Sequence, residues 1–276
     1  MLTMILYTWR EMLHRRVLAV TLLMVVAFLV LYGLAVRQLA LHSGDLDPLA
    51  KSIVIPQIFS AGLYFGSFIV SFLAVFSALG AVSGEVENGT VYGLVATPVR
   101  RAEILLGKFL GYALALVVYA ALFFLAIGAI VRGYTSLAPG GQGGALALFC
   151  LQPLVLLAVT VLGSTLLPTL ANGILMFMLY AVAMVGGMLE QIGWLLHVQS
   201  LQQIGIISSL IMPVDALYRK IVYILLTPTA TPLQALTQMG PFGAQVEPSV
   251  WMLVYTIAYL LVAVALAVRN FNRRDF

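Results

Sequence analysis

Long runs of apolar residues, separated by short polar stretches, dominate the chain. Most of these runs reach the roughly 20 residues that a helix needs to cross the hydrocarbon core of a bilayer. Lipid offers no partner for backbone amides, and the runs lack the alternation typical of a membrane β-barrel. We therefore expect an all-α membrane protein. Its six transmembrane helices are expected at Val17–Val36, Ile55–Ser83, Ile104–Val131, Ala145–Leu167, Gly173–Leu189 and Ser249–Val268.

A basic, amphipathic segment, Met1–Arg16, precedes the first run. Basic residues before an apolar run also occur in secretory signal peptides, so a cleaved signal peptide is the alternative to a transmembrane helix here. The run Val17–Val36 is long enough to span the membrane, and no small-residue cleavage site follows it. We expect a retained transmembrane helix.

Basic residues near the helix ends predict the orientation. Six crossings place both termini on one side of the membrane, and nine of the 14 Lys and Arg residues lie on that side, against five on the other. Positive charge marks the cytoplasmic side, so both termini are expected in the cytoplasm. The five on the other side are Arg37, Lys51, Arg132, Arg219 and Lys220.

Residues 190–248 form a long, mixed stretch between the fifth and sixth runs, expected to be external or re-entrant. Within it, Pro213–Leu226 places apolar residues on one helical face, and Asp215 and Arg219 form an i,i+4 pair on the other. This pattern favours a helix in the outer membrane interface. The alternative is that this helix and Gln203–Met212 dip into the membrane as a hairpin.

Composition agrees with a single membrane domain over residues 1–276. Hydrophobic residues make up 62% of the chain and charged residues 9%, whereas soluble domains are about half apolar and a quarter charged. The net charge of +4 lies at helix ends and not on a basic, aromatic-rich face, so we expect no nucleic-acid partner. The single cysteine, Cys150, excludes an intramolecular disulfide.

Residues suited to catalysis are scarce. The three histidines are scattered, so no metal site is expected, and no span carries a nucleophile–base or paired-carboxylate pattern. Few ionisable residues occur inside the predicted spans, which gives little support to a proton relay. We expect no catalytic residue and no cofactor bound by this chain.

The second span carries small hydroxyl side chains along one helical face. Such residues allow helices to approach closely and to form hydrogen bonds across the contact. Helix packing is the favoured interpretation, and lining of a translocation path or of a dimer face is the alternative. The residues are Ser60, Tyr64, Ser67 and Ser71.

Residues 83–103 form the most polar stretch of the chain. The order is Glu85 and Glu87, Gly89 and Thr90, the apolar Val91, Leu94 and Val95, then Pro98, Arg100 and Arg101. This order predicts a short amphipathic helix, a turn enforced by proline, and the start of a second helix. An ordinary solvated loop is the plain alternative.

The same stretch resembles the cytoplasmic connection in permeases of type-two ABC (ATP-binding cassette) transporters. The matching residues are Glu87, Gly89-Thr90, Leu94, Thr97-Pro98, Arg100-Arg101, Glu103, Leu106 and Gly107-Lys108. The plan of six spans behind an amphipathic N-terminal segment is also similar. The specific part of the resemblance is this segment, and the layout covers most of the chain.

The resemblance implies a coupling helix that docks on a cytoplasmic ABC ATPase subunit. The chain has no nucleotide-binding loop, so the ATPase would be a separate polypeptide that binds ATP and Mg. A second copy or a homologous permease would complete a dimer in the lipid of an inner (plasma) membrane, with export as the expected direction. The coupling contact would comprise Glu85, Glu87, Thr90, Val91, Leu94, Arg100 and Arg101.

Two other functions fit the composition. A membrane anchor or assembly factor would not need the polar coupling segment with its apolar patch. An intramembrane enzyme is expected to place His, Asp or Glu on helix faces near one interface, and few such residues occur. We therefore expect a transporter permease.

Overall fold

The computed structural model describes residues 8–9, 11–12, 16–42, 48–87, 89, 101–135, 141–226 and 248–273. In these residues all regular structure is helical, and six helices are long and apolar enough to cross a membrane, which confirms the expected fold class. The helices are α2 (Arg16–His42), α3 (Pro48–Ala78), α4 (Ser83–Glu87), α6 (Arg101–Tyr134), α7 (Gln142–Leu166), α8 (Thr169–Leu195), α9 (Gln199–Ile211), α10 (Val214–Leu226) and α12 (Val250–Arg273).

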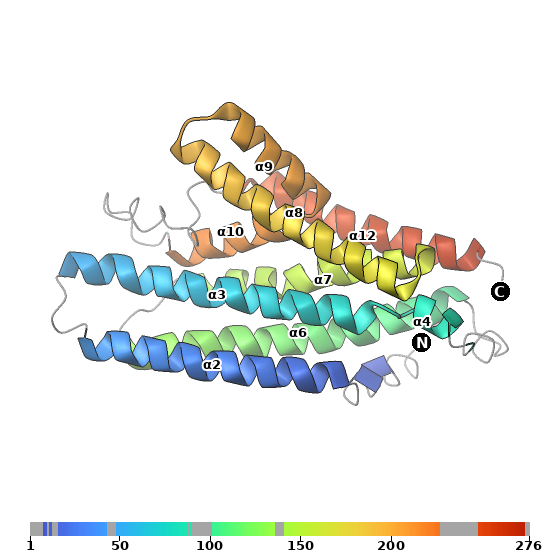
Figure 1. Ribbon diagram of the computed structural model, residues 1–276, viewed down its shortest axis with the longest axis horizontal. Coiled ribbons are helices and arrows are strands. Elements are labelled where there is room, and N and C mark those ends of the chain that lie inside the picture. Colours follow the sequence, from blue (N-terminus) through green and yellow to red (C-terminus); the bar gives the residue numbers. More distant parts are fainter. Residues whose placement is uncertain are drawn as a thin grey trace.

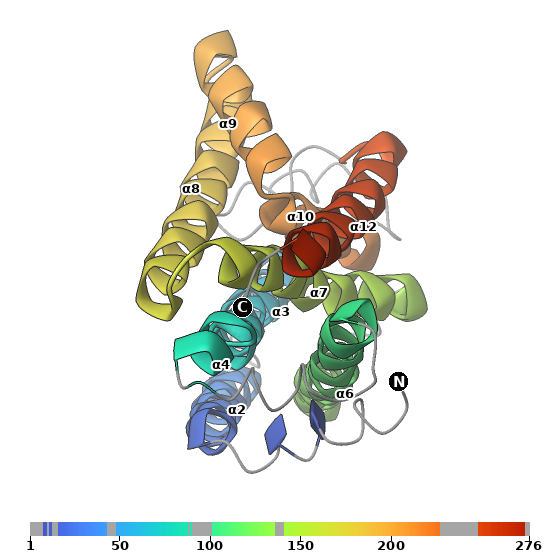
Figure 2. The ribbon, with the colours of Figure 1, turned by 90° about the vertical axis from the view of Figure 1, so that its right-hand side faces the viewer.

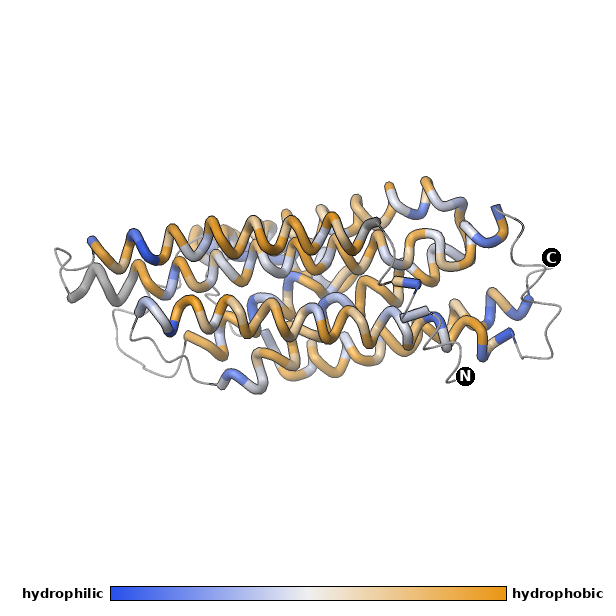
Figure 3. Tube along the Cα trace, turned by 90° about the horizontal axis from the view of Figure 1, so that it is seen from below, coloured by the Kyte–Doolittle hydropathy of each residue, from blue (hydrophilic) through white to orange (hydrophobic). Residues whose placement is uncertain are grey.

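Most of the long helices run along one common direction, and α8 and α9 lean away from the others (Figure 1). Helix α2 begins and α12 ends at the same end of the bundle, which we call the terminal end. The other end is called the opposite end. Hydrophobic positions dominate the middle of the chain trace, and more of the hydrophilic positions lie toward the two ends (Figure 3). This distribution is what helices that cross a bilayer require.

Helix α7 lies at the centre of the bundle. Figure 2 shows it between α2, α3 and α6 on one side and α8, α9, α10 and α12 on the other. It contacts α3, α6, α10 and α12. Leu156, Leu157 and Ala158 in its middle are completely buried, which explains why this helix is apolar on all sides.

Glycines in α3 allow close contact with the neighbouring spans. A Cβ atom on Gly62 would come within 2.6 Å of the Tyr32 ring of α2, and one on Gly66 would overlap Phe123 of α6. The Tyr32 hydroxyl also donates to the Ile58 carbonyl at 3.2 Å. Because a larger residue would push the helices apart, these glycines fix the packing of α2, α3 and α6.

Helix α9 runs back along α8 from the opposite end. Near that end the side chain of Gln202 donates to the Gly193 carbonyl at 3.1 Å. Farther toward the terminal end, Gly186 of α8 leaves the space that Ser208 of α9 occupies. The two helices therefore run antiparallel and pack along each other.

Helix α10 then returns toward the opposite end along α7. Its first residue, Val214, accepts a hydrogen bond of 3.1 Å from Gln152, which lies in the middle of α7. Near its last turn, Ile224 packs against Gly141, immediately before α7 begins. The turn between α9 and α10 consequently lies at mid-depth of the bundle.

Helix α10, for which the sequence left an interfacial and a re-entrant position open, is buried among the other helices of the chain. Leu217, Tyr218, Arg219 and Ile221 are at most 4% exposed, so no face of this helix is left to meet water. Arg219, on the polar face predicted from the periodicity, meets Glu190 of α8 and Ser209 of α9. Whether this helix lies at the membrane interface or dips into the membrane stays a prediction.

Candidate functional site

The first part of the predicted coupling segment lies at the terminal end. The structure describes α4, Gly89 and Arg101 of this segment, whereas Thr90, Val91, Leu94 and Arg100 lie outside the described residues. Helix α4 follows the end of α3 after a turn over residues 79–82. A short helix at this position agrees with the pattern of the sequence.

Glu87 binds the first turn of α8. Its carboxylate accepts a hydrogen bond from the Thr169 backbone N–H at 2.9 Å and another from the Thr169 hydroxyl at 3.1 Å. Pro168, at the N-cap position, supplies no side-chain cap. Because the N-terminus of a helix has free N–H groups and a partial positive charge, a carboxylate there is stabilising. Ser83 adds a contact of 2.9 Å to the Thr169 hydroxyl.

Glu85 ties α4 to α6. Its carboxylate forms an ion pair with Lys108, whose ammonium also donates to the Ala81 carbonyl at 2.9 Å. The Lys108 side chain is only 6% exposed, and a buried ammonium needs such partners to offset the loss of water. The resulting contacts hold the turn before α4 against the start of α6.

Asn172 of α8 connects three parts of the chain close to α4. Its side-chain amide donates to the Leu79 carbonyl at 3.2 Å and to the Thr160 carbonyl of α7 at 3.0 Å. Gly163 of α7 makes this possible, because a Cβ atom there would overlap the Asn172 amide. The end of α3, the end of α7 and the start of α8 are therefore connected by one buried side chain.

The structure thus brings Glu85 and Glu87 together at what we call the α4 junction, and both contact residues of this chain. The sequence did not predict these contacts, because Lys108 and Thr169 lie 23 and 82 positions away and no local pattern relates them. Glu87 is exposed, so a partner can reach it, and its role in an ATPase contact stays a prediction. Arg101 begins α6 near the same end.

The hydroxyl face of α3 lies inside the chain, against α7 and α10. Ser67 donates to the Gln152 side chain at 3.1 Å, and the Tyr218 hydroxyl donates to the Ser60 carbonyl at 2.9 Å. The ring of Tyr64 packs edge-on against that of Tyr218, with 5.1 Å between the ring centroids. Ser71 is 2% exposed. These contacts are those of helix packing, and a role in a translocation path or dimer face stays a prediction.

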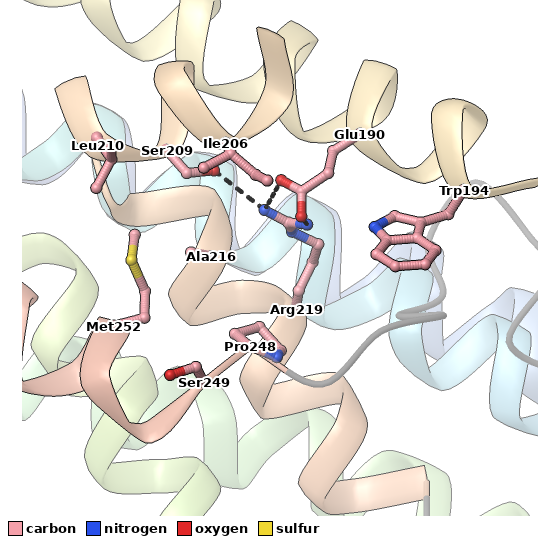
Figure 4. A pocket seen from close by; sticks show the side chains of 10 residues that line it. All are labelled: Glu190, Trp194, Ile206, Ser209, Leu210, Ala216, Arg219, Pro248, Ser249 and Met252. Carbon is pink, nitrogen blue, oxygen red and sulfur yellow. Dashed lines mark hydrogen bonds and ion pairs between the residues drawn. The ribbon is translucent and has the colours of Figure 1, made fainter. Parts of the chain in front are cut away.

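A buried cluster of charged residues joins α8 to α10 (Figure 4). The Arg219 guanidinium lies 2.8 Å from one oxygen of Glu190 and 2.9 Å from the other. Its Nε lies 3.0 Å from Asp215, which confirms the i,i+4 pair predicted from the sequence. The sequence did not identify Glu190 as the third member. The available signal was an isolated acid at the end of an apolar run.

Glycines of α8 and α9 make room for this cluster. A Cβ atom on Gly187 would overlap the Asp215 carboxylate, and one on Gly205 would overlap Glu190. The groups are therefore held where two backbones approach closely. Within the described residues, no group of three or more His, Cys, Asp or Glu side chains could hold a metal ion.

The comparison with protein families decides the class of protein. The model of the ABC-2 family transporter protein matches residues 9–276, which is nearly the whole chain. The chain belongs to the ABC-2 transporter family. This ABC-2 assignment confirms the resemblance found in the sequence and identifies a multi-pass membrane permease of an ABC transporter. No curated protein matches the chain.

Proposed function

We propose that this chain is the permease subunit of an ATP-binding cassette exporter, driven by a separate cytoplasmic ATPase through residues 83–103. The observation that carries the proposal is the ABC-2 family match over residues 9–276. The proposal also explains why the most polar stretch of the chain begins with α4, which is bound to α6 through Lys108 and to α8 through Thr169. An anchor without transport has no need of such a fastening.

The contacts of α4 suggest how movement would pass into the membrane. An ATPase that displaces the coupling segment would move α4, and the contacts of Glu87 and Ser83 with Thr169 would carry this movement to the start of α8. Helix α8 is packed along α9, so the α9–α10 hairpin would move with it. Helix α8 would then have two positions relative to the rest of the bundle, and ATP binding and substrate release would each favour one of them.

The distribution of positive charge supports a cytoplasmic terminal end. Arg219 and Lys220 are buried in α10 and do not belong to an aqueous loop. Removing these two from the five leaves three, and removing Lys108, which is likewise buried in α6, leaves eight of the nine on the other side. The bias that orients membrane proteins is therefore stronger than the sequence indicated.

The direct experiment is purification of the tagged chain from its native membranes in a mild detergent. A stoichiometric ABC ATPase should co-purify, together with a second copy of the chain or a homologous permease. Substrate-dependent ATP hydrolysis by this complex would support coupling. Isolation of a folded, intact chain without any ATPase would contradict the proposal and favour an anchor.

Two substitutions locate the contact. Val91→Asp places a charge in the apolar patch of the segment and should prevent ATPase binding, because the centre of a docking surface tolerates no unpaired charge. Asn272→Asp is the control: it lies at the same end, is exposed and is outside the segment. If equal amounts of ATPase co-purify with both variants, residues 83–103 are not part of the ATPase contact.

A further inference from the structure

A cavity of about 270 Å³ opens at the charged cluster, between α8, α9, α10 and the start of α12. It begins next to the Glu190–Arg219 pair and is distinct from the hydroxyl face of α3. Figure 4 shows the Trp194 indole directed toward the same space as this pair. The remaining lining is Ile206, Ser209, Leu210, Ala216, Pro248, Ser249 and Met252.

The walls of the cavity are mainly apolar and open to the outside of the chain. Trp194, Ile206 and Leu210 are between 43% and 49% exposed, so they border an accessible mouth. The position of Trp194 in the last turn of α8 places this mouth toward the opposite end of the bundle. An amphiphile could enter from the surrounding lipid with its apolar part against these side chains.

The polar corner of the cavity contains the Glu190 carboxylate and the Arg219 guanidinium. The guanidinium of Arg219 is directed at both oxygens of Glu190, at the Ser209 hydroxyl at 3.1 Å and at Asp215. One positive charge is therefore shared between two carboxylates. The Glu190 oxygens keep acceptor capacity, because a carboxylate accepts up to about four hydrogen bonds.

Lys220 adds a second positive charge behind the wall of the cavity, whereas Glu190 faces the space itself. The Lys220 ammonium donates to the Pro248 carbonyl at 3.1 Å, and the side chain is not among those that line the space. Trp194 adds an aromatic face, which attracts a cation and not an anion. The Glu190 carboxylate and the Trp194 ring thus both favour a cationic ligand.

We propose that this cavity binds amphiphilic amines, with the ammonium group at Glu190 and the apolar part against Trp194, Leu210 and Met252. This inference rests on the proposed permease function and names a class of ligand that the permease would bind. Binding is measured on the purified chain without an ATPase, so a failure here leaves the transport proposal standing.

The test compares three probes of the same shape: phenylbutylamine, phenylbutanol and phenylbutanoate. Binding to the purified chain in nonionic maltoside micelles is measured by titration calorimetry. The amine should bind about tenfold more tightly than the alcohol, since a hydrogen bond to a charged partner and a cation–aromatic contact are added. The acid should bind least. Equal affinities, or a preference for the acid, would overturn the proposal.

Substitutions in the cavity separate this site from nonspecific partition into micelles. Trp194→Leu should weaken amine binding several-fold, and Met252→Trp should abolish it by filling the space. Trp251→Leu is the matched control, because that tryptophan is 80% exposed and does not line the cavity. If Met252→Trp folds and binds the amine as the wild type does, the ligand lies elsewhere and the inference fails.

Glu190→Gln tests the charge directly. It should bring the affinity for the amine down to that for the alcohol while leaving alcohol binding unchanged. A folded variant that keeps the amine preference would contradict the role of Glu190. This variant also weakens the contact with Arg219, and Trp194→Leu and Met252→Trp test the site if it does not fold.

Discussion

Gly187 illustrates how a single hydrogen atom in place of a side chain positions charged groups inside a membrane protein. It lies in α8, where the Asp215 carboxylate of α10 occupies the space that a Cβ atom would take. Gly186 has the same relation to Ser208 of α9. The adjacent glycines therefore bring α8 close to both helices of the hairpin.

Gly187→Ala should destabilise the chain by about 1–3 kcal/mol, because the added methyl group forces helix separation or strains the Asp215–Arg219 contact. Thermal unfolding of the purified chain in micelles would show a lower melting temperature. Gly128→Ala in α6 is the control, since a Cβ atom there meets nothing within 4 Å. Similar melting temperatures for both variants would show that α8 and α10 have room to separate.

Gln152 joins three helices through one amide. It accepts from Ser67 of α3 and donates to the Val214 carbonyl of α10. Gln152→Leu should cost about 1–3 kcal/mol, because two buried polar groups lose their partner. Ser67→Ala should cost less.

A double-mutant cycle tests this contact. Combined with Gln152→Leu, Ser67→Ala should add almost nothing, since the bond is already lost. Fully additive effects on the melting temperature would mean that the two side chains do not act together.

At the residue scale the sequence predicted neighbours on one helix and missed those on different helices. Asp215 and Arg219 are four positions apart, so helical periodicity was sufficient to pair them. Glu190 is 29 positions from Arg219 and reaches it only because α9 turns back inside the bundle. The contacts of Glu85 and Glu87 were missed for the same reason.

At the scale of elements, the start of α8 depends on a residue from another helix. Pro168 precedes α8 and caps it with no side chain, so the Glu87 carboxylate serves the first N–H group. The contact gives the segment that follows α4 a direct connection to the span that carries the hairpin.

Glu87→Ala should increase amide hydrogen exchange in the first turn of α8, because the capping acceptor is lost; caps of this kind contribute about 1 kcal/mol. Glu87→Gln should retain most of the protection, since the amide oxygen still accepts. Glu103→Ala, an acidic residue in the first turn of α6, is the control. Unchanged exchange at Thr169 in the Ala variant would show that Pro168 and solvent suffice to start the helix.

Element boundaries follow from hydropathy only where the flanking residues are also apolar. The fifth span was expected at Gly173–Leu189, whereas α8 covers Thr169–Leu195. The additional first turn contains Asn172, which is completely buried and whose NH2 group donates to the Leu79 and Thr160 carbonyls. A hydropathy pattern assigns such residues to a loop, since it has no information on partners.

At the scale of the whole molecule, α7 lies between two groups of helices, which also touch each other directly through α6 with α12 and through α3 with α10. The contacts of α7 with α3 and α6 on one side and with α10 and α12 on the other leave its middle fully buried. The sequence predicted the six spans but not this division, because packing depends on residues far apart in the chain.

The orientation of the bundle can be tested with single cysteines. Cys150 would first be replaced by Ala, and a cysteine would be introduced at Asn272 or at Tyr134, which are exposed at the terminal and opposite ends. In intact cells an impermeant maleimide should label the cysteine at 134 and not the one at 272, because the terminal end carries the excess of positive charge.

Lysed cells supply the control for this experiment, since both cysteines should then react. A cysteine at Leu157, which is completely buried, should stay unlabelled in both conditions. Labelling at 272 in intact cells would reverse the orientation. The segment over residues 83–103 would then face away from any cytoplasmic ATPase, so the same result would also contradict the proposed coupling.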